Sequence, residues 1–240
     1  MQQAASVLSR RAASLEILIG VAAIVVSFAG VPAVVEALDL APLTTGMLQH
    51  IVIMNLLAPL IAHMLAGIAL VRCQEKYAPR RLAMAMTFQL LALWLWHAPP
   101  LHHAAMASPS LHAVMILSLL GASLWFWIEV FSHRGSARWR VLVALLVTGK
   151  LFCLLGALLT FAPNPLYMPV SVIAGPGHPA LAVSAAIADQ QAAGLLMLAA
   201  CPLTYILAGI VIAARWLGEL QRRPPELPRH FQISEGVAEP

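Results

Sequence analysis

Charged side chains are scarce in this sequence. Only 10% of its 240 residues are Asp, Glu, Lys or Arg, whereas 61% are hydrophobic and the mean hydropathy is +0.85. An ordinary soluble domain has about 25% charged residues, so the composition excludes that class and indicates a protein of the lipid bilayer. The net charge of +4 and the pI near 9.3 do not indicate a nucleic-acid partner, because Lys and Arg in loops also hold membrane helices in orientation.

Cysteine is also rare, and the usual motifs of enzymes are missing. We expect no extracytoplasmic disulfide framework, because Cys73 falls in a cytoplasmic loop while Cys153 and Cys201 fall within apolar runs. The sequence has no phosphate-binding glycine loop, nucleophile elbow or zinc-protease helix. Since no paired acid and base or activated nucleophile is visible either, we expect that the protein is not an enzyme.

Long apolar runs, in contrast, fill most of the chain. A hydrocarbon core of roughly 30 Å requires about 20 mainly apolar residues per helix. The runs that meet this requirement are Leu15 to Val35, Thr44 to Val71, Leu82 to Pro99, Leu111 to Phe131, Trp139 to Phe161 and Gln190 to Trp216. They predict an all-α fold, a polytopic bundle of about six transmembrane helices in residues 1–220. The polar, Pro-rich residues 221–240 are expected to form a flexible cytoplasmic tail.

The positions of Lys and Arg predict the topology. Basic residues precede the first run and follow the second, fourth and sixth, whereas the three alternate loops have none. In chain order they are Arg10, Arg11, Arg72, Lys76, Arg80, Arg81, Arg134, Arg138, Arg140, Arg215, Arg222, Arg223 and Arg229, with Lys150 alone inside a run. By the positive-inside rule, both termini are expected in the cytoplasm.

Histidines gather at the predicted outer face. Those at or near it are His50, His97, His102, His103, His112 and His178. His97 closes the third run and His112 opens the fourth, while Met47, His50 and Met54 recur at i, i+3 and i+7 on one face of the second helix. Imidazole and thioether groups together favour Cu(I) over hard cations, so these five residues are candidate copper ligands. The alternative is that Met fills the core and that interfacial His is merely solvated or hydrogen-bonded.

The longest connection, about Ala162 to Asp189, contains five prolines, so a continuous helix is excluded through most of it. Its apolar piece Ala180 to Ala188 can lie at the outer surface. Asp189 opens the sixth run, where it is expected to cap that helix, with a direct functional role as the alternative. Gln190 and its neighbour Gln191 enter an apolar helix, which favours packing or recognition inside the bundle.

Lys150 lies about twelve residues from the inner end of the fifth run, near mid-membrane. A charge there costs roughly 2.5 to 3.5 kcal/mol, so we expect an interior partner, a water-filled cavity or a neutral amine, with snorkelling as the alternative. Together with Cys153, His63 and Asn55, Lys150 leaves a metal transporter open as a second function. A membrane haemoprotein is a third, since outward His residues on separate helices can be axial ligands.

Several strings, in order and at sensible spacing, resemble the membrane-embedded cytochrome c oxidase assembly factors of the CtaG family. They are Met47-Leu48-Gln49-His50, Ala58-Pro59-Leu60, Trp94-Leu95-Trp96-His97-Ala98-Pro99, Leu111-His112-Ala113, Phe126-Trp127 and Asp189-Gln190-Gln191-Ala192-Ala193-Gly194-Leu195-Leu196-Met197. The Trp-His-x-Pro and Asp-Gln-Gln-x-Ala-Gly strings are the most specific. The resemblance spans about Thr44 to Trp216.

The resemblance implies an accessory protein of the bacterial plasma membrane that contacts haem-copper oxidase subunits and helps the oxidase mature, with copper as its cofactor or cargo. In the family pattern the second helix often carries another His four residues before His50, and the fourth another four residues after His112. Gly46 and Ile116 occupy those places here, which indicates a divergent member. Softer ligands from methionine can compensate, and the candidates are Met47, Met54, Met106 and Met115.

Overall fold

The structure is a computed structural model that describes residues 31–67, 78–133, 135–167 and 179–222. Within these ranges the chain consists of helices and their connections, without a β-strand. The helices are α2 (Val31–Leu38), α3 (Pro42–Ile51), η2 (Val52–Leu57), α4 (Ala58–Gly67), α5 (Ala78–Trp96), α6 (Pro99–Ala107), α7 (Pro109–Ser132), η5 (Gly135–Ala137), α8 (Arg138–Phe161) and α10 (Pro179–Gln221).

Four helices in the described part are long and apolar enough to cross a membrane. They are Pro42–Leu65, Pro109–Ser132, Arg138–Phe161 and Ala180–Gln221. A fifth crossing is made if the bent pair Pro79–Trp96 and Pro99–Ala107 counts as one span. The prediction of an all-helical, multi-pass membrane protein is therefore confirmed. The count of six is not, because most of the run Leu15 to Val35 lies outside the described residues.

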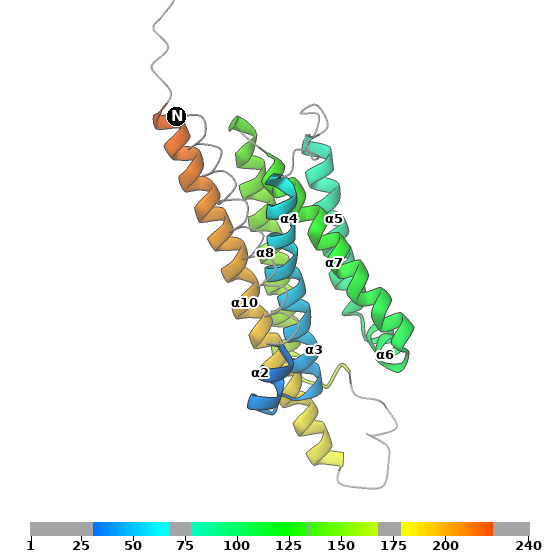
Figure 1. Ribbon diagram of the computed structural model, residues 1–240. Coiled ribbons are helices and arrows are strands. Elements are labelled where there is room, and N and C mark those ends of the chain that lie inside the picture. The colour runs from blue at the N-terminus through cyan, green and yellow to red at the C-terminus, as the bar shows by residue number, and fades with distance from the viewer. Residues whose placement is uncertain (1–30, 68–77, 134, 168–178, 223–240) are drawn as a thin grey trace, which may run out of the picture.

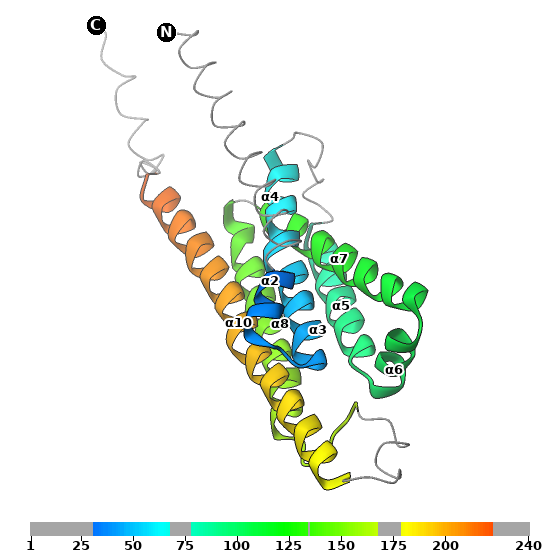
Figure 2. The same ribbon diagram turned by 60° about the horizontal axis from the view of Figure 1, so that its bottom comes forward.

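The long helices form an elongated bundle (Figures 1 and 2). Helix α10 packs along α8 and also contacts α3, whereas α7 contacts α4, η2, α5 and α6. The chain from Pro42 to Leu65 thus packs its first half against α10 and its second half against α7. Helix α6 lies at the end of the bundle where α3 and α10 begin (Figure 2).

A π-helical turn, η2, interrupts the span formed by α3 and α4. The backbone N–H of Ala58 bonds the carbonyl of Ile53, five residues back. Pro59 has no N–H, so the next carbonyl in this pattern, that of Met54, lacks a backbone donor. Ser123 Oγ and Trp127 Nε1 of α7 donate to it instead, each at 3.1 Å. The Ala-Pro-Leu string therefore joins this span to α7 through hydrogen bonds.

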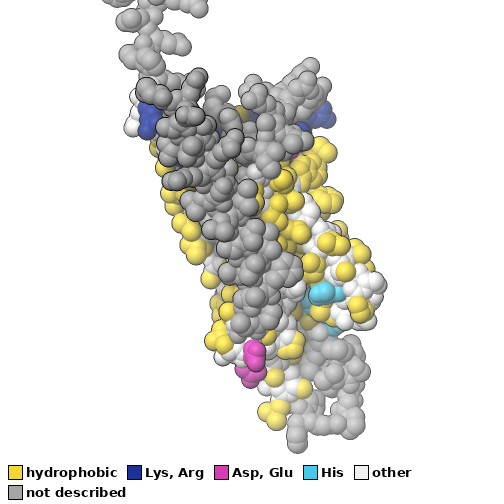
Figure 3. Space-filling view, in the orientation of Figure 1, with side chains coloured by type: hydrophobic (Ala, Val, Ile, Leu, Met, Phe, Trp, Pro, Cys, Tyr) yellow, Lys and Arg dark blue, Asp and Glu magenta, His cyan; other side chains and the backbone are white. Residues whose placement is uncertain are grey.

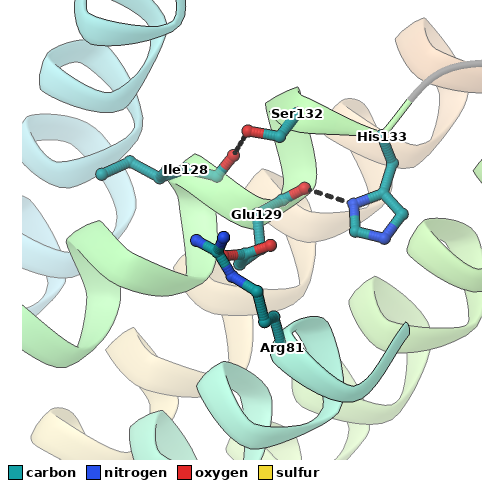
Figure 4. Close-up of polar contacts among 5 residues, drawn as sticks. All are labelled: Arg81, Ile128, Glu129, Ser132 and His133. Atoms are coloured by element: carbon teal, nitrogen blue, oxygen red, sulfur yellow. Dashed lines mark hydrogen bonds and ion pairs between the residues drawn. The ribbon is translucent and has the colours of Figure 1, made fainter. Parts of the chain in front are cut away.

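Two ion pairs connect the helix ends that carry the arginines. Arg81 Nη2 of α5 lies 2.7 Å from Glu129 Oε1 of α7, and the Glu129 side chain has 0% exposure. Figure 4 shows the Arg81 side chain reaching this carboxylate, while His133 Nδ1 donates to the Glu129 backbone carbonyl at 2.7 Å. Arg138 of α8 pairs with Glu219 of α10 at 2.9 Å. In Figure 3 the visible Lys and Arg side chains lie at this end, and the visible His lies toward the other.

Candidate functional site

A cavity of about 400 Å³ lies at the end of the bundle opposite the ion pairs. Helices α3, α6, α7 and α10 surround it, together with the break between α5 and α6 and the segment that follows α8. Its lining includes the side chains of Met47, His50, His97, His102, His103, Met106, His112, Met115, Tyr167, Asp189 and Gln190. We call it the outer cavity. Five histidines from four separate segments therefore meet in one space.

His97 lies at the break where the chain turns by 73° between α5 and α6. Pro99 and Pro100 follow it, and Pro at the start of a helix favours a new axis over continuation of the old one. His97 is 6% exposed, and its Nδ1 lies 2.7 Å from the carbonyl oxygen of Leu93. Because a carbonyl cannot donate, Nδ1 carries the proton and the Nε2 lone pair is left for another partner. This is the arrangement in which metal-binding histidines are held.

His50 is buried, at 5% exposure, and neither of its ring nitrogens has a hydrogen-bond partner. Its ring meets that of His97 edge to face, with 5.8 Å between the centroids. A buried polar group without a partner costs about 1 to 3 kcal/mol, and in native proteins such a group calls for an ion, a water or a functional explanation. Among the described residues of the outer cavity, His50 is therefore the one whose buried ring nitrogens both lack a protein partner.

Tyr167 lies in the segment after α8 and contacts two histidines of the outer cavity. Its hydroxyl donates to the backbone carbonyl of His97 at 2.8 Å, and its ring lies 4.5 Å from that of His102. Burial raises the pKa of the Tyr167 phenol to about 12, so the hydroxyl stays protonated and remains a donor. Tyr167 therefore joins the break after α5 to the segment that follows α8.

Asp189 caps a helix, but not the one predicted. The prediction that it starts the sixth helix is wrong, because α10 begins at Pro179 and the stretch Ala180 to Ala188 forms its first turns. Its carboxylate instead accepts from the backbone N–H groups of Leu43 and Thr44 at the start of α3, both at 2.9 Å, and from Thr44 Oγ1 at 2.6 Å. These bonds satisfy donors that a helix N-terminus leaves without partners, so Asp189 attaches α3 to α10.

Gln190 packs inside the bundle, as predicted for this polar pair, whereas Gln191 is exposed. The amide nitrogen of Gln190 donates to the carbonyl of Leu159 at 3.1 Å, and its oxygen accepts from the Leu166 backbone at 2.7 Å. The side chain thereby holds the segment after α8 against α10. Gln190 therefore positions the segment that carries Tyr167.

The structure brings four of the five predicted metal ligands into the outer cavity: Met47, His50, His97 and His112. Met54 lies outside it, in a smaller adjoining cavity with His50. In the ranges that the structure describes, no three side chains of His, Cys, Asp or Glu stand in an arrangement that can hold a metal ion. His178 lies outside the described residues.

Lys150 is exposed and lies away from the outer cavity. It lines a groove of about 370 Å³ between α8 and α10, together with Cys153 and Tyr205. Neither of the ion pairs found among the described residues involves Lys150. The interior partner that mid-membrane depth led us to expect is thus not found in the described part of the chain.

Sequence reasoning left three residues of the outer cavity unassigned. His102 and His103 line the outer cavity because the chain bends by 73° between α5 and α6. The Pro99-Pro100 pair predicts a break in the helix, but it does not predict the direction of the helix that follows. Tyr167 follows two prolines of the connection, Pro163 and Pro165, and has no motif around it. Gly46 also lines the outer cavity, and a Cβ added there would meet no atom within 4 Å. The place where the family often has another His is therefore open space.

The sequence has no significant match among the curated proteins or the solved structures. A family model described as the cytochrome c oxidase caa3 assembly factor matches residues 7–219, which is most of the chain and includes every residue of the outer cavity. The chain belongs to this cytochrome c oxidase assembly factor family.

Proposed function

We propose that this protein assists the maturation of a haem-copper oxidase by handling copper in the outer cavity, on the outer side of the bacterial plasma membrane. The family supports the assembly role. The positive-inside rule supports the outer side, since Arg81 and Arg138 lie at the opposite end of the bundle. The role is one of binding and transfer to oxidase subunits, without a catalysed reaction.

The observation that carries the copper part is the unpartnered ring of His50 facing the same space as His97. His97 presents its Nε2 lone pair, and Met47 adds a thioether to the same lining. Imidazole and thioether groups are ligands that Cu(I) accepts and that magnesium or calcium does not prefer. The donor set therefore fits copper. His50 and His97 would hold the ion, with His102, His103 and His112 around them.

A binding measurement tests the copper part. The purified full-length protein, kept reduced in detergent, is titrated with Cu(I) against a chromophoric chelator, and an absorption spectrum is recorded for haem. We expect Cu(I) binding without a Soret band. His50→Ala and His97→Ala should each weaken binding at the outer cavity at least tenfold, which corresponds to about 1.4 kcal/mol. His63→Ala is the matched control, because His63 is exposed on α4 and does not line the outer cavity.

A variant that adds a ligand tests the same copper site through an expected gain in affinity. Gly46→His would place two imidazoles at i and i+4 on α3, where a Cβ meets no other atom. Tighter Cu(I) binding by this variant is expected. Unchanged affinity in all three variants would remove copper from the proposal.

The assembly role needs a cellular test. In a strain from which the gene has been removed, the wild-type chain and His63→Ala should restore oxidase activity and oxidase-bound copper, whereas a His50→Ala, His97→Ala double variant should not. Full restoration by the double variant would separate assembly from these histidines. Normal oxidase in the deletion strain itself would refute the assembly role.

A further inference from the structure

A second, much smaller cavity adjoins the outer cavity and lies deeper in the bundle. Its volume is about 10 Å³, close to the space that a single water molecule or ion occupies. Its lining is Met47, His50, Ile51, Met54, Asn55, Leu93, Phe152, Met197 and Cys201. We call it the inner cavity. Met47 and His50 line both cavities, so the two spaces share a wall on α3.

Four sulfur-containing side chains line the inner cavity. They belong to Met47, Met54, Met197 and Cys201, whose exposed fractions are 4%, 2%, 1% and 3%. Met197 and Cys201 stand at i and i+4 on α10. Met47 comes from α3, which packs against α10, and Met54 comes from η2, whose Asn55 hydrogen-bonds to Cys201. Core methionine alone would be ordinary packing. Here the methionines converge with a thiol and an imidazole on one small space.

Polar groups around the inner cavity lack the partners that burial demands. Both ring nitrogens of His50 and the Oδ1 atom of Asn55 are buried without a hydrogen bond. The other end of the Asn55 amide is engaged, because Nδ2 donates to Cys201 Sγ at 3.3 Å. This hydrogen bond fixes the position of the Cys201 sulfur, as hydrogen bonds from neighbouring groups fix the ligand atoms of metal sites.

We propose that the inner cavity is a Cu(I) site in which Cys201 Sγ is the anionic ligand, His50 and the surrounding methionine thioethers complete the coordination, and Asn55 positions the thiolate. The charge balance favours Cys201, since burial of an isolated cation in the bundle is costly whereas Cu(I) and a thiolate are together neutral. On binding, the Cys201 S–H bond is replaced by an S–Cu bond and the proton is released to water. Copper remains Cu(I), and no electron is transferred.

The inner site extends the proposed copper handling and rests on it, because the outer cavity is the route by which the ion arrives. His50 is common to the two linings and can therefore pass the ion from imidazole ligands to sulfur ligands. Soft ligands favour Cu(I) over the other common cations, so the inner site would also select for copper. The ion would be retained there until an oxidase subunit accepts it.

Cu(I) titration combined with X-ray absorption spectroscopy at the copper edge tests the inner site. The wild-type chain should show copper–sulfur scattering, and Cys201→Ser should lose it together with about one equivalent of bound Cu(I). Cys153→Ser and Cys73→Ser are the matched controls and should keep both. Met197→Leu, which preserves the volume of the packed side chain, should weaken binding in a chain whose helix content is unchanged. This second variant covers the case in which Cys201→Ser does not fold.

The outcomes separate the two proposals. Copper–sulfur scattering and stoichiometry that survive Cys201→Ser and Met197→Leu would overturn the inner site and leave the outer cavity in place. Binding that is lost in Cys201→Ser but unaffected by His97→Ala would support the inner site and overturn copper binding by the outer cavity. Absence of Cu(I) binding by the wild-type chain would overturn both.

Discussion

Gly194 lies at a close contact between α8 and α10, and replacing it by Ala should separate these helices. A Cβ added at Gly194 would lie 2.8 Å from the backbone oxygen of Gly156 and 2.8 Å from the backbone nitrogen of Thr160. These are backbone atoms, so the contact is relieved only if a helix moves. Overpacking of this kind costs about 1 to 3 kcal/mol. Gly209 lies on the same helix, and a Cβ there would meet no atom within 4 Å.

The two variants form a matched pair. Each Gly→Ala change also brings the higher helix propensity of Ala, worth about 1 kcal/mol in water, so the difference between Gly194→Ala and Gly209→Ala isolates the steric cost. Reversible unfolding in mixed micelles, followed by circular dichroism, should show Gly194→Ala to be less stable than Gly209→Ala by about 1 to 3 kcal/mol. Equal free energies of unfolding would refute the close contact between α8 and α10.

Three further substitutions test the polar contacts. Asp189→Ala should lower the free energy of unfolding by about 2 kcal/mol, because three donors at the start of α3 lose their acceptor, whereas exposed Gln191→Ala should be neutral, and equal effects would contradict the capping role. Arg81→Ala leaves the buried carboxylate of Glu129 unpaired and should cost about 3 kcal/mol. Exposed Arg80→Ala is its control, and Glu129→Gln should restore part of the loss in the double variant. Tyr167→Phe removes the bond to the His97 carbonyl and should cost about 1 kcal/mol in thermal unfolding, so unchanged stability would exclude that bond.

Apolar length was sufficient to predict most of the membrane helices. The runs starting at Thr44, Leu111 and Trp139 correspond to the spans Pro42–Leu65, Pro109–Ser132 and Arg138–Phe161. This agreement has a simple cause, because a bilayer requires about 20 apolar residues in sequence, and that requirement is local. The cytoplasmic location of both termini stays a prediction.

The start of α10 was predicted wrongly because two signals competed. The Asp189-Gln190-Gln191 triplet interrupts the apolar pattern and has the composition of a helix start, and the prolines before it indicated a loop. The alanine-rich stretch after Pro179 nevertheless has high helix propensity, and Pro at the first position permits a helix to begin there. Asp189 caps α3 through a contact between residues about 145 positions apart, which no local pattern contains.

The candidate site could be predicted in its residue types but not in its shape. The spacing of Met47, His50 and Met54 correctly placed them near one another on the helix, and all three line the inner cavity, but only Met47 and His50 also line the outer cavity. The sequence places Cys201 in an apolar run, and neither its hydrogen bond with Asn55 nor its place in the inner cavity can be read from that run. The shape of the two cavities and the surroundings of Cys201 both depend on packing between helices.

The length of α10 sets the depth of the outer cavity. Its 43 residues extend for about 65 Å, roughly twice the hydrocarbon thickness. Asp189 and Arg215 are 26 positions apart, or about 39 Å along the axis, which is close to the full thickness of a bilayer with its headgroups. With Arg215 in one headgroup layer, we expect Asp189, and with it the rim of the outer cavity, near the other. From the length of α10 we therefore expect the histidines of the outer cavity to lie within reach of water and not in hydrocarbon.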